Sequence, residues 1–222
     1  MVKYRGSPFI DEKDKEHAVE DAKNIATSIA LPVYEEIKYN NTVLNLDSVE
    51  RYIQHASKIA VTDCSCRVKR KHCDSPLDVC LPLNDAANML IGKGFAKEVS
   101  KTEALGIVRR AHDAGLVPMA GMRTDTPKPE GVNWICNCCS CCCGTIGVSL
   151  WLGKDVHMLK GLATTLTDSS KCNSCGACVD RCHFEARKIV GGRLVFDKDL
   201  CFGCGLCVDK CPSDAISLIH LQ

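Results

Sequence analysis

Aromatic residues make up only 5% of this 222-residue chain, which leaves few rings to stack against nucleobases. Charge of one sign is not in excess either, because 28 Lys and Arg residues face 27 Asp and Glu residues. A chain without a broad basic face is a poor candidate for nucleic-acid binding. The sequence has no run near the ~18 apolar residues that cross a bilayer, and no G-x-x-x-x-G-K-[ST], H-E-x-x-H or G-x-S-x-G motif. We therefore expect neither nucleic-acid binding nor membrane insertion.

The N-terminal segment Met1–His17 is crowded with charged residues and lacks the apolar core, about 7–15 residues long, of a secretory signal. We therefore expect a cytoplasmic protein. Cysteine is the abundant residue, with 18 in the chain. Because disulfides are rare in the reducing cytoplasm, so many cysteines indicate metal or iron–sulfur ligation.

The last eight cysteines form an internal repeat. A shift of 29 residues places the first four on the last four, and Gly176 then falls on Gly205. Each copy reads C-x2-C-x2-C-x3-C, the spacing of the bacterial two-cluster ferredoxins. Two zinc sites or unliganded thiols are the alternatives, but zinc is usually bound by two separated pairs of cysteines. The eight residues are Cys172, Cys175, Cys178, Cys182, Cys201, Cys204, Cys207 and Cys211.

On these residues, the segment Leu162–Gln222 resembles the bacterial 2[4Fe-4S] ferredoxins. The resemblance implies a repeated β-α-β fold that holds two [4Fe-4S] clusters. It assigns one cluster to Cys172, Cys175, Cys178 and Cys211, and the other to Cys201, Cys204, Cys207 and Cys182. The expected proline follows Cys211, whereas His183 follows Cys182. We expect His183, and His72 beside Cys73, to be surface residues and not ligands.

Ten further cysteines lie upstream, and none precedes Cys64. The first four have the spacing C-x-C-x6-C-x6-C and suffice for one [4Fe-4S] cluster or one zinc ion. Basic residues crowd positions 67–72 between the second and third of them. This run either offsets thiolate charge and docks an anionic partner, or is a solvated loop. The four cysteines are Cys64, Cys66, Cys73 and Cys80.

The other six upstream cysteines crowd into the eight residues from Cys136 to Cys143. In an extended segment, alternate side chains face opposite sides. Such a segment suits a position between two metal centres, or a bridge in a larger cluster. The run also resembles metallothionein-type clustering, which is the alternative. The alternation predicts one face with Cys136, Cys138 and Cys142, and another with Cys139, Cys141 and Cys143.

Helical patterns precede and separate the upstream cysteines. Apolar residues at helical spacing and capping signals predict four helices. In the second of them, we expect Val49, Ile53, Ala56 and Ile59 to face inward. The proline- and glycine-containing segment Pro118–Gly131 predicts a loop, and Val132–Ile135 a short strand. The expected helices are Asp11–Ala30, one opened by a capping box at residues 47–50, Asn84–Ile91, and one capped by Ser100 that runs to Ala114.

These patterns together predict an α+β protein of two domains. Residues 1–160 are expected to form a mostly helical, cysteine-rich domain that binds metal or iron–sulfur clusters. Residues 161–222 are expected to form the ferredoxin-like two-cluster domain.

The runs Cys64-Ser-Cys-Arg67 and Cys136–Cys143, followed by the ferredoxin-type tail, make the chain similar to a group of ferredoxin-domain iron–sulfur proteins of anaerobes. The resemblance implies soluble, low-potential electron transfer. We expect one or two further iron–sulfur clusters on the ten upstream cysteines, and a flavin or metal enzyme as redox partner. One alternative is a reductase whose upstream cluster acts on a sulfur species or a small acceptor, and another is metal storage or sensing.

Overall fold

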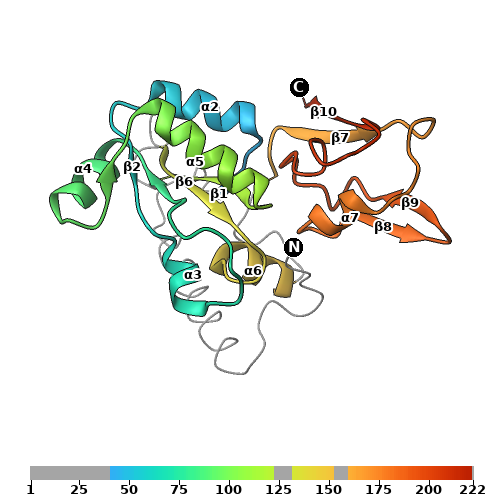
Figure 1. Cartoon of the computed structure of the whole chain (residues 1–222), viewed down its shortest axis with the longest axis horizontal. Helices are drawn as coiled ribbons and strands as arrows, with labels where there is room; N and C mark the ends of the chain where they lie inside the picture. The colour runs from blue at the N-terminus through green and yellow to red at the C-terminus, as the bar shows by residue number, and fades with distance from the viewer. Residues whose placement is uncertain (1–40, 123–131, 153–159, 222) are drawn as a thin grey trace, which may run out of the picture.

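The computed structural model describes residues 41–122, 132–152 and 160–221. A larger region of helices and sheet is followed, from residue 160, by a smaller region of short strands that lies beside it (Figure 1). The expected helix Asp11–Ala30 lies outside the described residues. In the part of the chain that is described, no helix has the length and apolar character needed to cross a membrane.

A four-stranded sheet, antiparallel at every pairing, forms the centre of the larger region. Strand β6 lies between β5 and β3, and its last residue is a cysteine of the upstream run. A separate antiparallel pair is formed by β2 (Ala60–Val61) and β4 (Lys97–Glu98). The order in the larger sheet is β1 (Asn41–Val43), β5 (Val117–Met122), β6 (Val132–Cys138) and β3 (Leu81–Pro82).

Two helices, α2 (Leu46–His55) and α5 (Lys101–Asp113), lie side by side against this sheet (Figure 1). Their apolar residues join Ala120 of β5 and Ile135 of β6 in one buried core. Because an apolar stripe at helical spacing buries one face of a helix, the inward positions could be predicted. Val49, Ile53, Ala56 and Ile59 are all buried, as expected.

The predicted N-terminus is confirmed for α5, but α2 begins earlier than predicted. Ser100 and Glu103 form the capping box of α5. Helix α2 is capped instead by Asn45, whose side chain accepts a hydrogen bond from the Ser48 N–H at 2.9 Å. The expected box at residues 47–50 is wrong, because asparagine caps a helix as well as aspartate or serine does and Asn45 precedes that run.

Three further helices of the larger region lie in the described residues. Helix α4 (Asn84–Gly92) confirms the predicted helix at Asn84–Ile91. Helix α3 (Ser65–Arg70) begins directly after Cys64, and α6 (Gly144–Leu152) directly after the cysteine run. Several of the upstream cysteines therefore lie in or beside α3, β6 and α6.

The overall α+β class is confirmed, and the described part of the larger region combines its helices with a four-stranded sheet. The loop predicted at Pro118–Gly131 is wrong for residues 118–122, which belong to β5. Proline removes only one N–H from a ladder, and the Pro118 carbonyl still accepts a hydrogen bond from Leu44. The predicted strand at Val132–Ile135 is confirmed and extends to Cys138. Residues 123–131 lie outside the described ranges.

The smaller region repeats a unit of strand, cysteine loop and strand. Residues with positive φ recur at the 29-residue shift: Ser174 with Gly203, Gly176 with Gly205, and Glu185 with Asp214. The repeat seen in the sequence is therefore also a repeat of backbone conformation. Strand β7 pairs with β10 and β8 pairs with β9, so each pair takes one strand from each copy. The elements are β7 (Ala163–Thr167), α7 (Ala177–Arg181), β8 (Arg187–Val190), β9 (Arg193–Phe196) and β10 (Ile216–His220).

Candidate metal centres

A cavity lies at the second set of ferredoxin-type cysteines. Apolar side chains form part of its wall, including Phe184 and Phe202, whose rings stack with their centroids 4.4 Å apart. A wall of thiols and apolar groups suits a [4Fe-4S] cluster. The assignment of ligands to clusters stays a prediction, which this arrangement supports. The cysteines that line the cavity are Cys182 from the first repeat copy and Cys201, Cys204 and Cys207 from the second.

Three of the thiols in this cavity, those of Cys182, Cys204 and Cys207, are held in an environment that favours their neutral form. Burial raises the pKa of Cys204, and it raises the pKa of Cys207 to about 11. The thiolate is the form that binds metal. Iron binding therefore has to displace protons here and stabilise the thiolates itself.

A buried cation lies between the two sets of ferredoxin-type cysteines. Arg187, the first residue of β8, is 2% exposed. It donates hydrogen bonds to the hydroxyls of Thr165 at 2.7 Å and Thr167 at 2.9 Å. Its charge also interacts with the thiols of Cys178 and Cys207, which the resemblance assigns to different clusters. Sequence reasoning missed this residue, because nothing in the cysteine spacing distinguishes it from a surface arginine.

The ten upstream cysteines come together in two groups. Six of them interact thiol to thiol in a closed circuit, here called the six-cysteine ring. The other four bring all their Sγ atoms within 4.8 Å of one another and are here called the four-cysteine group. The ring runs through Cys64, Cys66, Cys143, Cys138, Cys136 and Cys80. The four-cysteine group consists of Cys73, Cys139, Cys141 and Cys142.

This division corrects the faces expected from alternation. Cys136 and Cys138 do share one group, because both lie in β6. The strand ends at Cys138, and the chain then turns, so the two-residue period no longer applies. Cys142 therefore lies with the four-cysteine group and Cys143 with the ring, opposite to the expectation.

The first sequence group is divided as well. Cys64 and Cys80 lie on the neighbouring segments that the bridge between Thr62 and Cys80 holds together, and both belong to the ring with Cys66. Cys73 lies beyond the end of α3 and belongs to the other group. These four cysteines are therefore divided between two groups, whereas their spacing in the sequence had suggested a single centre.

Hydrogen bonds between thiols lower the pKa of Cys66 and Cys136 in the ring and of Cys139 in the four-cysteine group. Hydrogen bonding from Cys138, and then from Cys80, lowers the pKa of Cys136 to about 5. Hydrogen bonding from Cys141 and Cys142 lowers the pKa of Cys139 far below its usual value. Both groups thus present a thiolate, the form that a metal requires.

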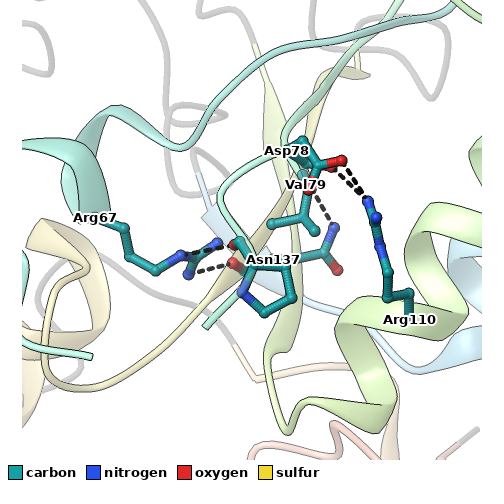
Figure 2. Close-up of polar contacts among 6 residues, drawn as sticks. Arg67, Asp78, Val79, Arg110 and Asn137 are labelled. Atoms are coloured by element: carbon teal, nitrogen blue, oxygen red, sulfur yellow. Dashed lines mark hydrogen bonds and ion pairs between the residues drawn. The ribbon is translucent and has the colours of Figure 1, made fainter. Parts of the chain in front are cut away.

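Arg67 of α3 lies between the two groups. It is 1% exposed, and it donates from Nε to the Pro76 carbonyl and from Nη1 to the Asn137 carbonyl, each at 3.1 Å (Figure 2). Nη1 also lies 3.7 Å from Sγ of Cys139 in the four-cysteine group. Its charge interacts with Cys138 of the ring. Arg67 therefore supplies positive charge to both groups at once.

The backbone around Arg67 is fixed by further polar contacts. Asn137 donates from Nδ2 to the Val79 carbonyl at 2.7 Å, and Arg110 of α5 pairs with the Asp78 carboxylate at 2.8 Å (Figure 2). The segment before Cys80 is thus held against both β6 and α5.

His183 joins the ferredoxin-like region to the upstream cysteines. Its Nε2 donates to the Gly115 carbonyl at 2.6 Å, and its Nδ1 then accepts from the Ser140 hydroxyl at 3.0 Å. Burial lowers the pKa of His183, which favours this neutral form. His72 is also half-buried and donates to the Cys141 carbonyl at 2.8 Å. The expectation that both histidines are simple surface residues is therefore wrong.

The ring and the cavity at the second set of ferredoxin-type cysteines share one apolar core. Cys138 and Cys143 of the ring are buried in it, with Cys136 packed against it. Cys182 and Cys204 of the ferredoxin-like region pack against the same core. The two sites are therefore neighbours in the folded chain, although Cys204 lies 68 residues after Cys136 in the sequence.

Residues 194–217 match the family model of the 4Fe-4S binding domain. The chain thus carries a ferredoxin-type 4Fe-4S domain at its C-terminus, which supports an iron–sulfur electron-transfer role with at least one [4Fe-4S] cluster. No curated protein matches the chain.

Proposed function

We propose that this chain is a multi-cluster iron–sulfur electron-transfer protein. Two [4Fe-4S] clusters occupy the ferredoxin-like region, and a further iron–sulfur cluster occupies the six-cysteine ring. Low-potential electrons pass between the ferredoxin-like clusters and the ring, and from there to or from a partner redox enzyme that carries a flavin or a metal.

The observation that carries this proposal is the apolar core shared by the ring and the cavity at the second set of ferredoxin-type cysteines. Cys136 and Cys138 on one side and Cys182 and Cys204 on the other pack against it. Electron transfer between centres is fastest when they are close, and no other protein has to dock between neighbouring sites. A relay within one chain follows from this proximity.

The clusters supply the one-electron chemistry, and the protein supplies their surroundings. The stacked rings of Phe184 and Phe202 form part of the apolar wall of the cavity at the second set of ferredoxin-type cysteines. Buried Arg187 offsets thiolate charge in the ferredoxin-like region, and Arg67 does so upstream. Hydrogen bonds, charge and solvent exposure around a cluster are what set its reduction potential.

Anaerobic purification followed by EPR spectroscopy during a reductive titration tests the relay. We expect spin–spin coupling between the ring cluster and the second ferredoxin cluster, because the two sites are adjacent. Cys201→Ser, which removes a ligand of the second cluster, should abolish the coupling. The matched variant Cys172→Ser, in the other ferredoxin cluster, should retain it. A ring without iron, or a ring cluster whose spectrum is the same in both variants, would contradict the relay.

A second candidate function is suggested by the number of thiols in the ring. Six thiols exceed the four that a cubane requires, so a ring cluster leaves two thiols for a substrate. In such a reductase, two electrons and two protons convert a disulfide into two thiols at the ring. Anaerobic oxidation of reduced viologen with sulfur or disulfide acceptors separates the two candidates. Turnover that disappears in Cys66→Ser favours the reductase, and no turnover with intact clusters favours the carrier.

A further inference from the structure

The four-cysteine group has the dimensions of a site for one metal ion. The Sγ of Cys73 lies 3.8 Å from that of Cys139 and 3.9 Å from that of Cys142, and the Sγ atoms of Cys141 and Cys142 are 3.9 Å apart. Four thiolates in a tetrahedron around zinc, each at about 2.3 Å, are separated by about 3.8 Å. Four thiolates on the four irons of a cubane lie roughly 6 Å apart. The observed separations match the single ion.

The ferredoxin-type cysteines provide an internal reference for this spacing. All eight lie in the described part of the chain, and within that part no three of them come within 4.8 Å of one another as potential ligands. The same holds for the described cysteines of the six-cysteine ring. Contracted, mutually close sulfurs are therefore a property of the four-cysteine group, and not of every cysteine cluster in this molecule.

The surroundings of the group suit an anionic metal centre. One zinc ion with four thiolates carries a net charge of about −2. The guanidinium of Arg67, 1% exposed, has Nη1 beside Cys139, and its buried Nη2 has no hydrogen-bond partner among the described residues. A buried cation with an unused donor beside four thiols indicates that negative charge belongs there.

We propose that Cys73, Cys139, Cys141 and Cys142 bind a single Zn²⁺ ion in a closed tetrahedral site. Binding exchanges the thiol protons for the metal ion and releases those protons to solvent. Zinc is not redox-active, and a site with four protein ligands has no open position for substrate. The ion therefore acts as a cross-link between the segment after α3 and the turn after β6, which are 66 residues apart at Cys73 and Cys139.

This inference goes beyond the proposed relay, because it concerns cysteines that take no part in the electron path. The zinc site also explains how the turn from β6 to α6 is held while Cys138 and Cys143, on either side of it, bind the ring cluster. Only the ring is then left for an additional iron–sulfur cluster upstream.

Metal and sulfide analysis of the full chain, purified without oxygen, tests the proposal. We expect about one zinc ion per chain in addition to the iron. Cys73→Ser is the sharpest variant, because Cys73 is the half-buried member of the group and lies outside the cysteine run. It should lose the zinc and keep the iron and the acid-labile sulfide. The matched variant Cys66→Ser, in the ring, should keep the zinc and lose about four irons with their sulfide.

A second measurement tests the proposal even if the Cys73→Ser variant fails to fold. Unmodified protein produced with Co²⁺ in place of zinc should show the intense absorption of cobalt in a tetrahedral thiolate site. Absence of zinc, with loss of iron and sulfide in Cys73→Ser, would overturn the proposal in favour of a cluster. One iron bound without sulfide would overturn the choice of zinc. Failure of the relay alone would alter the EPR coupling of the iron centres and leave the zinc content unchanged.

Discussion

The two cysteine-rich regions of this chain hold their sulfurs in different ways. In the ferredoxin-like region, cysteines at regular spacing line a cavity, and burial raises the pKa of thiols such as Cys204. In the upstream region, cysteines from distant segments interact with one another. Their hydrogen bonds lower the pKa of Cys66, Cys136 and Cys139. The same hydrogen bonds raise the pKa of the partner thiols Cys64, Cys138 and Cys141. The first arrangement leaves room for an inorganic cluster, whereas the four-cysteine group closes on the volume of one ion.

Although one region is a short repeat and the other is assembled from distant segments, both place a buried positive charge beside their thiols. Each region places a nearly inaccessible arginine between two sets of thiols, Arg187 in the ferredoxin-like region and Arg67 upstream. A buried charge is costly unless it is paired. Each arginine is therefore evidence that negative charge is present on both of its sides.

Removing the upstream arginine is expected to have the largest effect. Arg67→Met leaves the thiolates of two groups without their buried cation, so we expect the free energy of unfolding to fall by about 3–5 kcal/mol. Zinc and ring iron should be lost with it. Anaerobic thermal unfolding and metal analysis measure both effects. Arg109→Met, at the exposed ion pair with Glu50, is the control and should change neither. A variant Arg67→Met with full metal content would contradict the role given to Arg67.

Removing the arginine of the ferredoxin-like region should change a potential more than the fold. Arg187→Met takes a unit charge from beside Cys178 and Cys207. At roughly 7 Å and an effective dielectric constant of about 20, this is worth about 2 kcal/mol, or about 100 mV for one electron. Because the cation favours the more negative reduced cluster, both potentials should become more negative. EPR-monitored titration measures the shift, with Arg187→Lys as the variant that retains the charge. Unchanged potentials in Arg187→Met would refute the argument.

Loss of the polar contact between the two regions is expected to have a smaller effect. His183→Phe keeps an aromatic ring but removes the hydrogen bonds to Gly115 and Ser140. Loss of a buried polar partner costs about 1–3 kcal/mol, and the EPR coupling between the ring and the second ferredoxin cluster should weaken as the regions separate. Ser140→Ala removes one of these bonds and should have a smaller effect. Identical coupling in His183→Phe and the unmodified chain would show that the shared apolar core alone positions the two sites.

The smallest expected effect concerns the cap of α2. Asn45→Ala should lower the free energy of unfolding by about 1 kcal/mol, because it removes the acceptor of the Ser48 N–H. Asp47→Ala, at the position favoured by the sequence pattern, should cost less. Thermal unfolding of the two variants decides which residue is the cap. A larger loss of unfolding free energy in Asp47→Ala than in Asn45→Ala would show that the capping box lies at residues 47–50 after all.

The ferredoxin-like repeat could be predicted because its information is local. Three cysteines of each copy lie within seven residues, and the positive-φ positions beside them, such as Gly176 and Gly205, also repeat in the sequence. Helices α4 and α5 could be predicted for the same reason, since capping and apolar spacing act within a few residues. The strand β5 was missed because its proline and glycine resemble a loop, while its pairing partners lie far along the chain.

The sequence by itself determined that this chain is rich in cysteine, and that eight of its 18 cysteines follow a ferredoxin spacing. Only the tertiary structure decided which of the ten upstream cysteines lie together. The end of β6 at Cys138 and the position of α3 place Cys73 with Cys142, and Cys64 with Cys143 in one ring. Such groupings depend on how strands pair and helices pack over long separations, and residue spacing along the chain carries no direct record of that geometry.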